Sequence, residues 1–150
     1  MNRDYLQQLA EMRLADARAL LATGANDAGA YYLAGYAVEC ALKASIAKAW
    51  NARLRTIGEF PYPDFGDTSF TKQNYYSHRI RELVKLAGLE ALLVQDRRAR
   101  RLLNTNWGIA EDWNEESRYV VFRNRQDAEN IVNAVENSEE GVIAWLTNYW

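Results

Sequence analysis

The 150-residue sequence is poor in the residues that interrupt helices, with only two prolines and eight glycines. Both are unfavourable inside a helix, so their scarcity favours a helical protein. The chain also has one cysteine, Cys40, which excludes an internal disulfide and is typical of a reduced, cytoplasmic setting. One cysteine and one histidine cannot supply a usual zinc site. We therefore expect no metal site and no cofactor.

Other absences narrow the class of protein further. No uninterrupted apolar run is long enough to span a membrane, because Glu39 and Lys43 interrupt the best candidate, residues 31–50. The first residues, MNRDYLQQLAEM, are polar and amphipathic, unlike a secretory signal. The stretch GDTSFTK lacks the spacing of a glycine-rich phosphate loop. We expect a cytoplasmic protein that does not bind membranes.

The net charge of −2 is unevenly distributed. Residues 71–125 hold eleven Lys and Arg against seven Asp and Glu, whereas residues 126–150 hold five acids and no base. Such a basic segment can contact phosphates, or it can be a solvated face that pairs with the acidic end. The candidate phosphate contacts are Arg97, Arg98, Arg100, Arg101, Arg123 and Arg125.

Apolar residues recur at helical spacing along most of the chain. A first helix is predicted between a cap at Asn2 and a stop at Gly24, and a second from a cap at Asp27 to about Trp50. Residues 51–76 hold both prolines and predict a long loop. A third helix is predicted from a cap at Ser77 to Gly88.

Two more helices complete the predicted fold. A fourth is expected to run through 92–103 towards Trp107. The last has the four-and-three spacing of a narrow bundle seam, formed by Ile131, Val135, Ser138, Val142, Trp145 and Tyr149. We predict a single all-α domain over residues 1–150, an antiparallel (up-and-down) four-helix bundle with short extra helices.

The charged pair in the second helix needs an explanation, because residues around it are apolar almost all the way round. Glu39 and Lys43 are four residues apart with the acid first, the better order for a helical pair. A buried pair rarely gains stability over apolar residues, so partners from elsewhere are expected. His78 and Arg118 are the first candidates. Such a cluster either fixes helix register or belongs to a functional site.

The stretch AYYLAGYAVECALKA resembles the signature helix of the HEPN (higher eukaryotes and prokaryotes nucleotide-binding) family. The resemblance continues in HRIRELVKLAGL, in the pair Arg118–Tyr119 and in the closing WLTNYW. It covers the chain from about residue 4 onward. The residues that carry it are Ala37, Glu39, Ala41, Leu42, Lys43, His78, Leu83, Arg118 and Tyr119.

The resemblance implies an antiparallel helical bundle that forms a homodimer. It also implies a partner, because many family members are encoded beside a minimal nucleotidyltransferase in toxin–antitoxin pairs. Many members are RNases that need no metal and use an Arg followed, after four to six residues, by a His. In that chemistry the His accepts the proton of the attacking hydroxyl and the Arg stabilises the phosphate charge.

This sequence departs from the RNase pattern. The positions from which an Arg would complete the motif with His78 are Thr71, Lys72 and Gln73, and no His follows Arg118. Lys72 can supply charge but not the bidentate geometry of Arg.

Two hypotheses therefore remain. The first is a non-catalytic HEPN-like module that binds a protein partner or a nucleotide or RNA, in a toxin–antitoxin-type pair with a nucleotidyltransferase. The second is a metal-independent RNase with a degenerate site formed by His78 and Arg118. The candidate polar, ligand-binding cluster is the same in both: Glu39, Lys43, His78, Arg118 and Tyr119.

Overall fold

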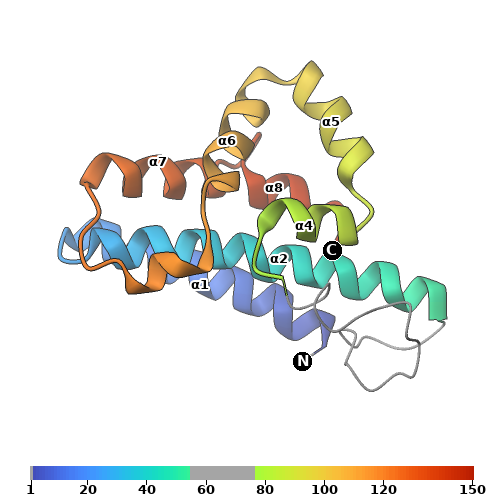
Figure 1. The fold of residues 1–150 in the computed structure, drawn as a ribbon, viewed down its shortest axis with the longest axis horizontal. Coiled ribbons are helices and arrows are strands. Elements are labelled where there is room, and N and C mark those ends of the chain that lie inside the picture. The colour runs from blue at the N-terminus through green and yellow to red at the C-terminus, as the bar shows by residue number, and fades with distance from the viewer. Residues whose placement is uncertain (1, 55–76) are drawn as a thin grey trace.

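The computed structural model describes residues 2–54 and 77–150, and these form helices joined by short connections (Figure 1). Seven α-helices and one 3₁₀-helix are found in this part of the chain: α1 (Arg3–Thr23), α2 (Asp27–Leu54), α4 (Ile80–Leu86), α5 (Glu90–Ala99), α6 (Arg101–Glu111), η1 (Glu115–Tyr119), α7 (Arg125–Glu136) and α8 (Val142–Leu146). The prediction of an all-α protein is confirmed.

Helices α1 and α2 form a long antiparallel hairpin whose ends follow from the sequence. The Asn2 side chain accepts a hydrogen bond from the backbone N–H of Tyr5 and caps α1. Gly24 ends the helix with a φ of 65°, which glycine adopts without strain. Asn26, rather than the predicted Asp27, caps α2 by accepting from the N–H of Gly29 at 2.7 Å. Helix α2 also continues four residues beyond Trp50.

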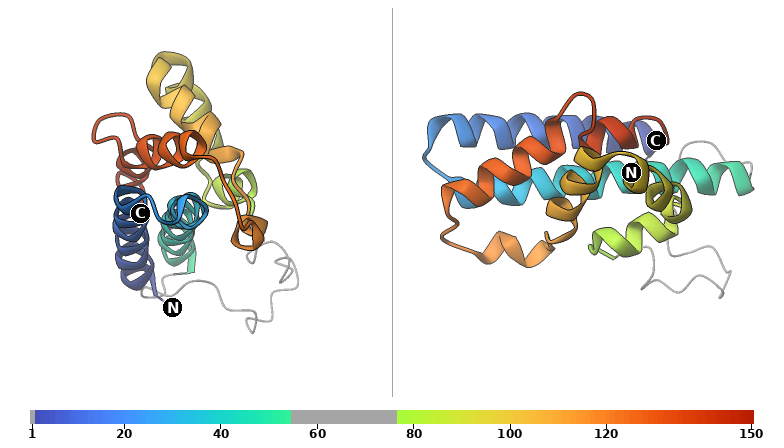
Figure 2. Two further views of the ribbon diagram at one scale, coloured as in Figure 1. Left: turned by 90° about the vertical axis from the view of Figure 1, so that its left-hand side faces the viewer. Right: turned by 90° about the horizontal axis from the view of Figure 1, so that it is seen from above.

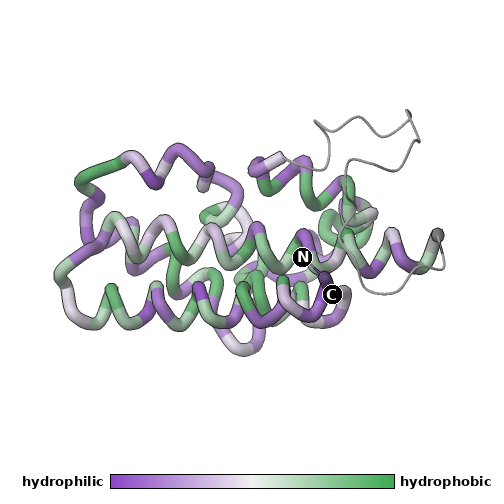
Figure 3. Tube along the Cα trace, turned by 90° about the horizontal axis from the view of Figure 1, so that it is seen from below, coloured by the Kyte–Doolittle hydropathy of each residue, from purple (hydrophilic) through white to green (hydrophobic). Residues whose placement is uncertain are grey.

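Helix α2 lies at the centre of the molecule, in contact with α1, α4, η1, α7 and α8. This position explains why its sequence is apolar on every side. Many of its buried residues are alanines, which let neighbouring helices approach closely. Seen end-on, α1 and α2 lie side by side, α7 covers them, and α5 and α6 project away (Figure 2). Coloured by hydropathy, hydrophobic residues recur in bands along the two long helices (Figure 3).

The predicted third helix is shorter than expected. Helix α4 begins at Ile80, and Ser77 does not occupy its N-cap position. The Ser77 hydroxyl instead donates to the Glu82 carboxylate and accepts from the backbone N–H of Arg79. Residues 77–79 therefore form an extended segment, the lead into α4, that is fixed by the hydrogen bonds of Ser77. His78 lies in this segment. The predicted loop at 51–76 lies mostly outside the described residues.

The predicted fourth helix is two helices, because the backbone of Arg100 is extended (φ −126°, ψ 101°). The Arg100 guanidinium donates to Glu140 Oε1 and to the backbone oxygen of Glu139, both at 2.9 Å. These two hydrogen bonds fix the interruption between α5 and α6 to the turn that precedes α8.

The predicted last helix is also divided, into α7 and α8. The side chain of Asn137 accepts from the backbone N–H groups of Glu139 and Glu140, a local alternative to helical bonding. Gly141 follows where a Cβ atom would lie 2.2 Å from the backbone oxygen of Asn137. The seam residues on both sides of this turn are nevertheless buried, apart from Ser138 and Tyr149, so the spacing found the core but not the break. None of the described helices has the length and hydropathy needed to cross a membrane.

Candidate functional site

Glu39 is the most buried charged residue of α2, with 1% of its surface exposed. Its Oε1 atom accepts from Lys43 Nζ at 2.6 Å and lies 2.9 Å from His78 Nδ1. The Lys43 side chain is only 13% exposed. The expectation that both charges are at least partly buried and meet a polar partner is confirmed, and the partner is His78.

This arrangement explains how two charges are tolerated in an apolar helix. The Glu39 carboxylate and the Lys43 ammonium compensate each other one helical turn apart. The His78 imidazole, which is not part of α2, contacts the same carboxylate oxygen. Buried charges that are paired in this way avoid most of the cost of leaving water. The cluster also ties the lead into α4 to the middle of α2.

His78 is held in an orientation that suits proton transfer. Its Nδ1 faces Glu39, so a proton there donates to the carboxylate, which leaves Nε2 as the acceptor nitrogen of the neutral ring. The side chain is 41% exposed. A histidine oriented by a carboxylate is the usual arrangement of a general base.

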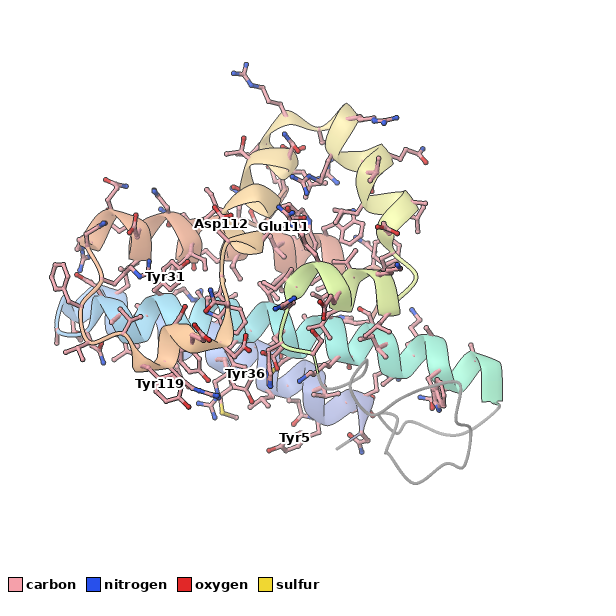
Figure 4. All side chains as sticks on the ribbon, in the orientation of Figure 1. Tyr5, Tyr31, Tyr36, Glu111, Asp112 and Tyr119 are labelled. Atoms are coloured by element: carbon pink, nitrogen blue, oxygen red, sulfur yellow. The ribbon has the colours of Figure 1, made fainter. Side chains whose placement is uncertain are left out.

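Arg118, the other candidate partner of Glu39, does not join this cluster. It lies on η1, which packs against the first part of α2. Its guanidinium is 4.9 Å from the centre of the Tyr119 ring. The neighbouring side chain of Tyr119, and more weakly that of Tyr32, raises the pKa of Arg118. Tyr119, labelled in Figure 4, is exposed and makes no hydrogen bond to Glu39, so it also lies outside the cluster.

Between Arg118 and His78, α2 presents two aromatic rings. Tyr32 and Tyr36 are stacked, with ring centres 5.9 Å apart and planes at 10°. Both are partly exposed. Burial, followed by the charges of Cys40 and Glu39, raises the pKa of Tyr36 to about 12, so its hydroxyl stays protonated. We define the α2 track as Tyr32, Tyr36, Glu39 and Lys43, with Arg118 at one end and His78 at the other.

The first end of the track opens into a groove of about 410 Å³. Its lining combines small residues with an aromatic ring and a cation: Asn26, Ala28, Gly29, Tyr32 and residues 117–121. Trp113 supports this end from beneath, with its ring 6.1 Å from that of Tyr32. It packs on Gly35, where a Cβ atom would lie 2.2 Å from the indole.

The distance between the two ends of the track limits what it can do. Arg118 lines the same groove as Tyr32, whereas His78 contacts Glu39, seven residues later on α2. Seven residues of α-helix span about 10 Å. A general base and a phosphate clamp that act on one phosphodiester must both lie within hydrogen-bonding reach of it, and no contact within the described residues brings Arg118 and His78 together.

Three of the six candidate phosphate arginines donate hydrogen bonds to acidic side chains. Arg97 donates to Glu111, Arg100 to Glu140, and Arg125 to Asp27 and Glu129. Within the described residues, Arg98 and Arg101 are exposed and form no ion pair. The run DRRARR is divided by the break at Arg100, so its arginines do not form a continuous stripe. The sixth, Arg123, lies in a different pocket.

Sequence reasoning missed the two stacked tyrosines. Their i,i+4 spacing, continued by Lys43 eleven residues after Tyr32, is a visible signal of a shared helix face. The role of Gly35 had no such signal, because Trp113 is far away in sequence. Cys40 is buried, and burial raises the pKa of its thiol to about 12, so it is not a nucleophile at neutral pH.

Comparisons of the chain with protein-family models, with curated proteins and with solved structures find no match.

Proposed function

We propose that the chain is a HEPN-like helical module that binds RNA or a nucleotide along the α2 track without cutting it. The observation that carries this proposal is the stacked pair Tyr32–Tyr36 placed between the cation of Arg118 and the Glu39–His78 cluster. Aromatic side chains stack on bases of any sequence, and a neighbouring arginine contacts the phosphates. The proposal includes the antiparallel four-helix bundle, which the helical spacing and the resemblance predict, and the cytoplasmic location, which the single cysteine predicts.

Charge and exposure support a nucleotide ligand at this end of the track. Arg118 is exposed and forms no ion pair with a carboxylate in the described residues, unlike Arg97, Arg100 and Arg125. Its five N–H donors suit a phosphate group. The groove beside it has an aromatic wall at Tyr32 and is within the size range of small-molecule sites.

Two observations favour binding over cleavage. The Arg–His spacing of the family's RNases is absent from the sequence, and no contact within the described residues joins Arg118 to His78. The alternative, a degenerate RNase, draws its support from the Glu39–His78 contact, which orients the imidazole as a general base would require.

A second candidate function, protein binding, rests on residues 119–122. Val121 is 97% exposed and Phe122 is 81% exposed, and both follow the exposed Tyr119. Contiguous apolar residues on a surface mark interaction sites. We propose that two copies pair through this segment in a symmetric homodimer, with a nucleotidyltransferase as the further partner that the resemblance implies.

RNA binding is tested by fluorescence anisotropy with a labelled single-stranded RNA at two salt concentrations. Arg118→Gln should weaken binding by about tenfold, since hydrogen bonds to charged groups contribute roughly 1.5–3 kcal/mol. Tyr36→Leu should weaken binding without changing its salt dependence, because it removes stacking and leaves the charge. Arg101→Gln is the matched control, as Arg101 is exposed, forms no ion pair in the described residues and lies off the track.

The same RNA, incubated with protein and resolved on a gel, separates the two hypotheses. We expect no cleavage. Cleavage that survives repurification and is lost in both His78→Ala and Arg118→Ala would establish the RNase. Equal affinity of wild type, Arg118→Gln and Tyr36→Leu for the RNA would reject the α2 track as a binding site.

A further inference from the structure

A second pocket lies between α2, α6 and the start of α7, away from the α2 track. It has a volume of about 340 Å³, within the range of small-molecule sites. We call it the Tyr31 pocket. Its lining mixes one cation, two acids, an amide, a phenol and one apolar side chain: Tyr31, Ile109, Asp112, Arg123, Asp127 and Asn130. Asp112 lies next to α6 and on the opposite side of α2 from Tyr36 and Tyr119 (Figure 4).

Tyr31 is a mostly buried residue that borders the pocket, and its hydroxyl oxygen is not among the fully buried polar atoms. The residue is 8% exposed, and its hydroxyl makes no hydrogen bond to any described residue. Burial raises the pKa of Tyr31, so the hydroxyl is neutral and can both donate and accept. A hydroxyl that is neither fully buried nor bonded within the protein is available to a ligand. This one borders a pocket that can hold a ligand.

The Arg123 guanidinium also lacks a hydrogen-bond acceptor among the described residues. Its guanidinium lies 4.0 Å from the centre of the Tyr31 ring, and its side chain is 28% exposed. Its ion pair with Asp127 has a separation of 4.0 Å, which is too long for a hydrogen bond. No described residue accepts a hydrogen bond from it. The guanidinium over the Tyr31 ring lines the pocket, and its N–H donors suit a carboxylate.

The acids lie on the other side of the cation. Asp112 follows the last residue of α6 and forms no ion pair within the described residues, so it faces the pocket with its charge uncompensated. The C-terminal end of a helix also favours a cation nearby. Asp127 accepts from Asn124 Nδ2 at 2.8 Å and keeps its place at the start of α7. The pocket thus has a positive part and a negative part.

We propose that the Tyr31 pocket binds a small zwitterion, a free α-amino acid, with its carboxylate on Arg123 and its ammonium group facing Asp112 and Asp127. An anion alone would face two carboxylates, and a cation alone would face Arg123. A molecule that carries both charges satisfies both parts, and the Tyr31 hydroxyl gains the partner that it lacks. The site shares no lining residue with the α2 track, so it stands apart from RNA binding.

The test uses the purified full chain and the twenty common amino acids as probes. Saturation-transfer NMR identifies which of them bind, and titration calorimetry measures the affinity of the strongest. We expect at least one to bind with a dissociation constant in or below the millimolar range. The amine and the carboxylic acid that share its carbon skeleton should each bind about tenfold or more weakly, because each lacks one charge-assisted hydrogen bond.

Variants separate this site from non-specific binding. Tyr31→Phe keeps the ring under Arg123 and should weaken binding several-fold without loss of fold, since the hydroxyl has no internal partner. Arg123→Lys should weaken binding about tenfold, and Arg101→Lys is its control. If Arg123→Lys fails to fold, Tyr31→Phe decides.

Three results would overturn the proposal: no saturation transfer from any amino acid at millimolar concentration, equal binding of the amine or acid analogue, or unchanged affinity in Tyr31→Phe. RNA affinity measured in Tyr31→Phe should equal that of wild type. Loss of RNA binding in Arg118→Gln alone would leave the amino-acid site untouched.

Discussion

Helix α2 buries a charge, whereas the segment after η1 exposes a phenylalanine. Glu39 has 1% of its surface exposed, yet Phe122 has 81% and Val121 has 97%. Hydropathy alone would place these residues the other way round. The difference lies in what surrounds each one: Glu39 has Lys43 and His78 as partners, and Phe122 has no contact that removes it from water.

Residues such as Glu39 stabilise the fold, whereas residues such as Phe122 stay exposed unless a second molecule covers them. A buried charge with two internal partners is satisfied, so it supports the structure whether or not anything binds. An exposed apolar segment remains unsatisfied in the isolated chain, and burying it against a second molecule would gain free energy. Three substitutions test this division.

The largest effect is expected at Glu39. Glu39→Ala leaves Lys43 largely buried without its counter-ion and releases His78, so the free energy of unfolding should fall by about 3–5 kcal/mol. The measurement is denaturant unfolding followed by circular dichroism. Glu129→Ala is the control, because it removes an exposed i,i+4 pair with Arg125 and should cost less than about 1 kcal/mol.

A double variant tests whether the unpaired Lys43 ammonium causes the loss of stability in Glu39→Ala. If the cost of Glu39→Ala comes from the stranded ammonium, adding Lys43→Met should restore part of the stability. A Glu39→Ala variant within about 1 kcal/mol of wild type would mean that the cluster contributes as little as a surface pair.

An intermediate effect is expected where α2 meets the exposed region. Gly35→Ala would place a Cβ atom 2.2 Å from the Trp113 ring, so the ring must move and the protein should lose about 1–3 kcal/mol. Gly108→Ala is the matched control in α6, where the added Cβ meets no atom within 4 Å. It should stabilise the protein by roughly 0.5–1 kcal/mol, as Ala normally does in a helix interior. Thermal unfolding of both variants gives the comparison, and equal stabilisation of the two would contradict the packing of Trp113 on Gly35.

Local signals in the sequence were enough for the helical class and for the ends of α1. Asn2 and Gly24 act through their own residues and their immediate neighbours, so their roles can be read from the sequence. The turn at Asn137–Gly141 has a similar signal, a capping side chain followed by glycine, but the apolar spacing on both sides hid it.

Long-range contacts could not be predicted in the same way. The break at Arg100 depends on Glu139 and Glu140, which lie some forty residues further along the chain. The meeting of His78 with Glu39 was one of two alternatives, and sequence spacing could not choose between His78 and Arg118. That choice depends on where η1 and the lead into α4 dock along α2, which only the packed structure determines.

The smallest effect on stability is expected at Val121, and this is the informative result. Val121→Ala should change the free energy of unfolding by less than about 0.5 kcal/mol, because the side chain is already in water. The same substitution at Val132, which is 1% exposed on α7, should cost about 2 kcal/mol or more by leaving a cavity.

Light scattering at micromolar concentration tests whether the exposed segment, residues 119–122, pairs two copies of the chain. Wild type should be a dimer and Phe122→Asp a monomer of unchanged stability, since a charge in a paired apolar interface loses its water without gaining a partner. A wild-type monomer, or a dimer that tolerates Phe122→Asp, would show that residues 119–122 do not pair two copies of the chain.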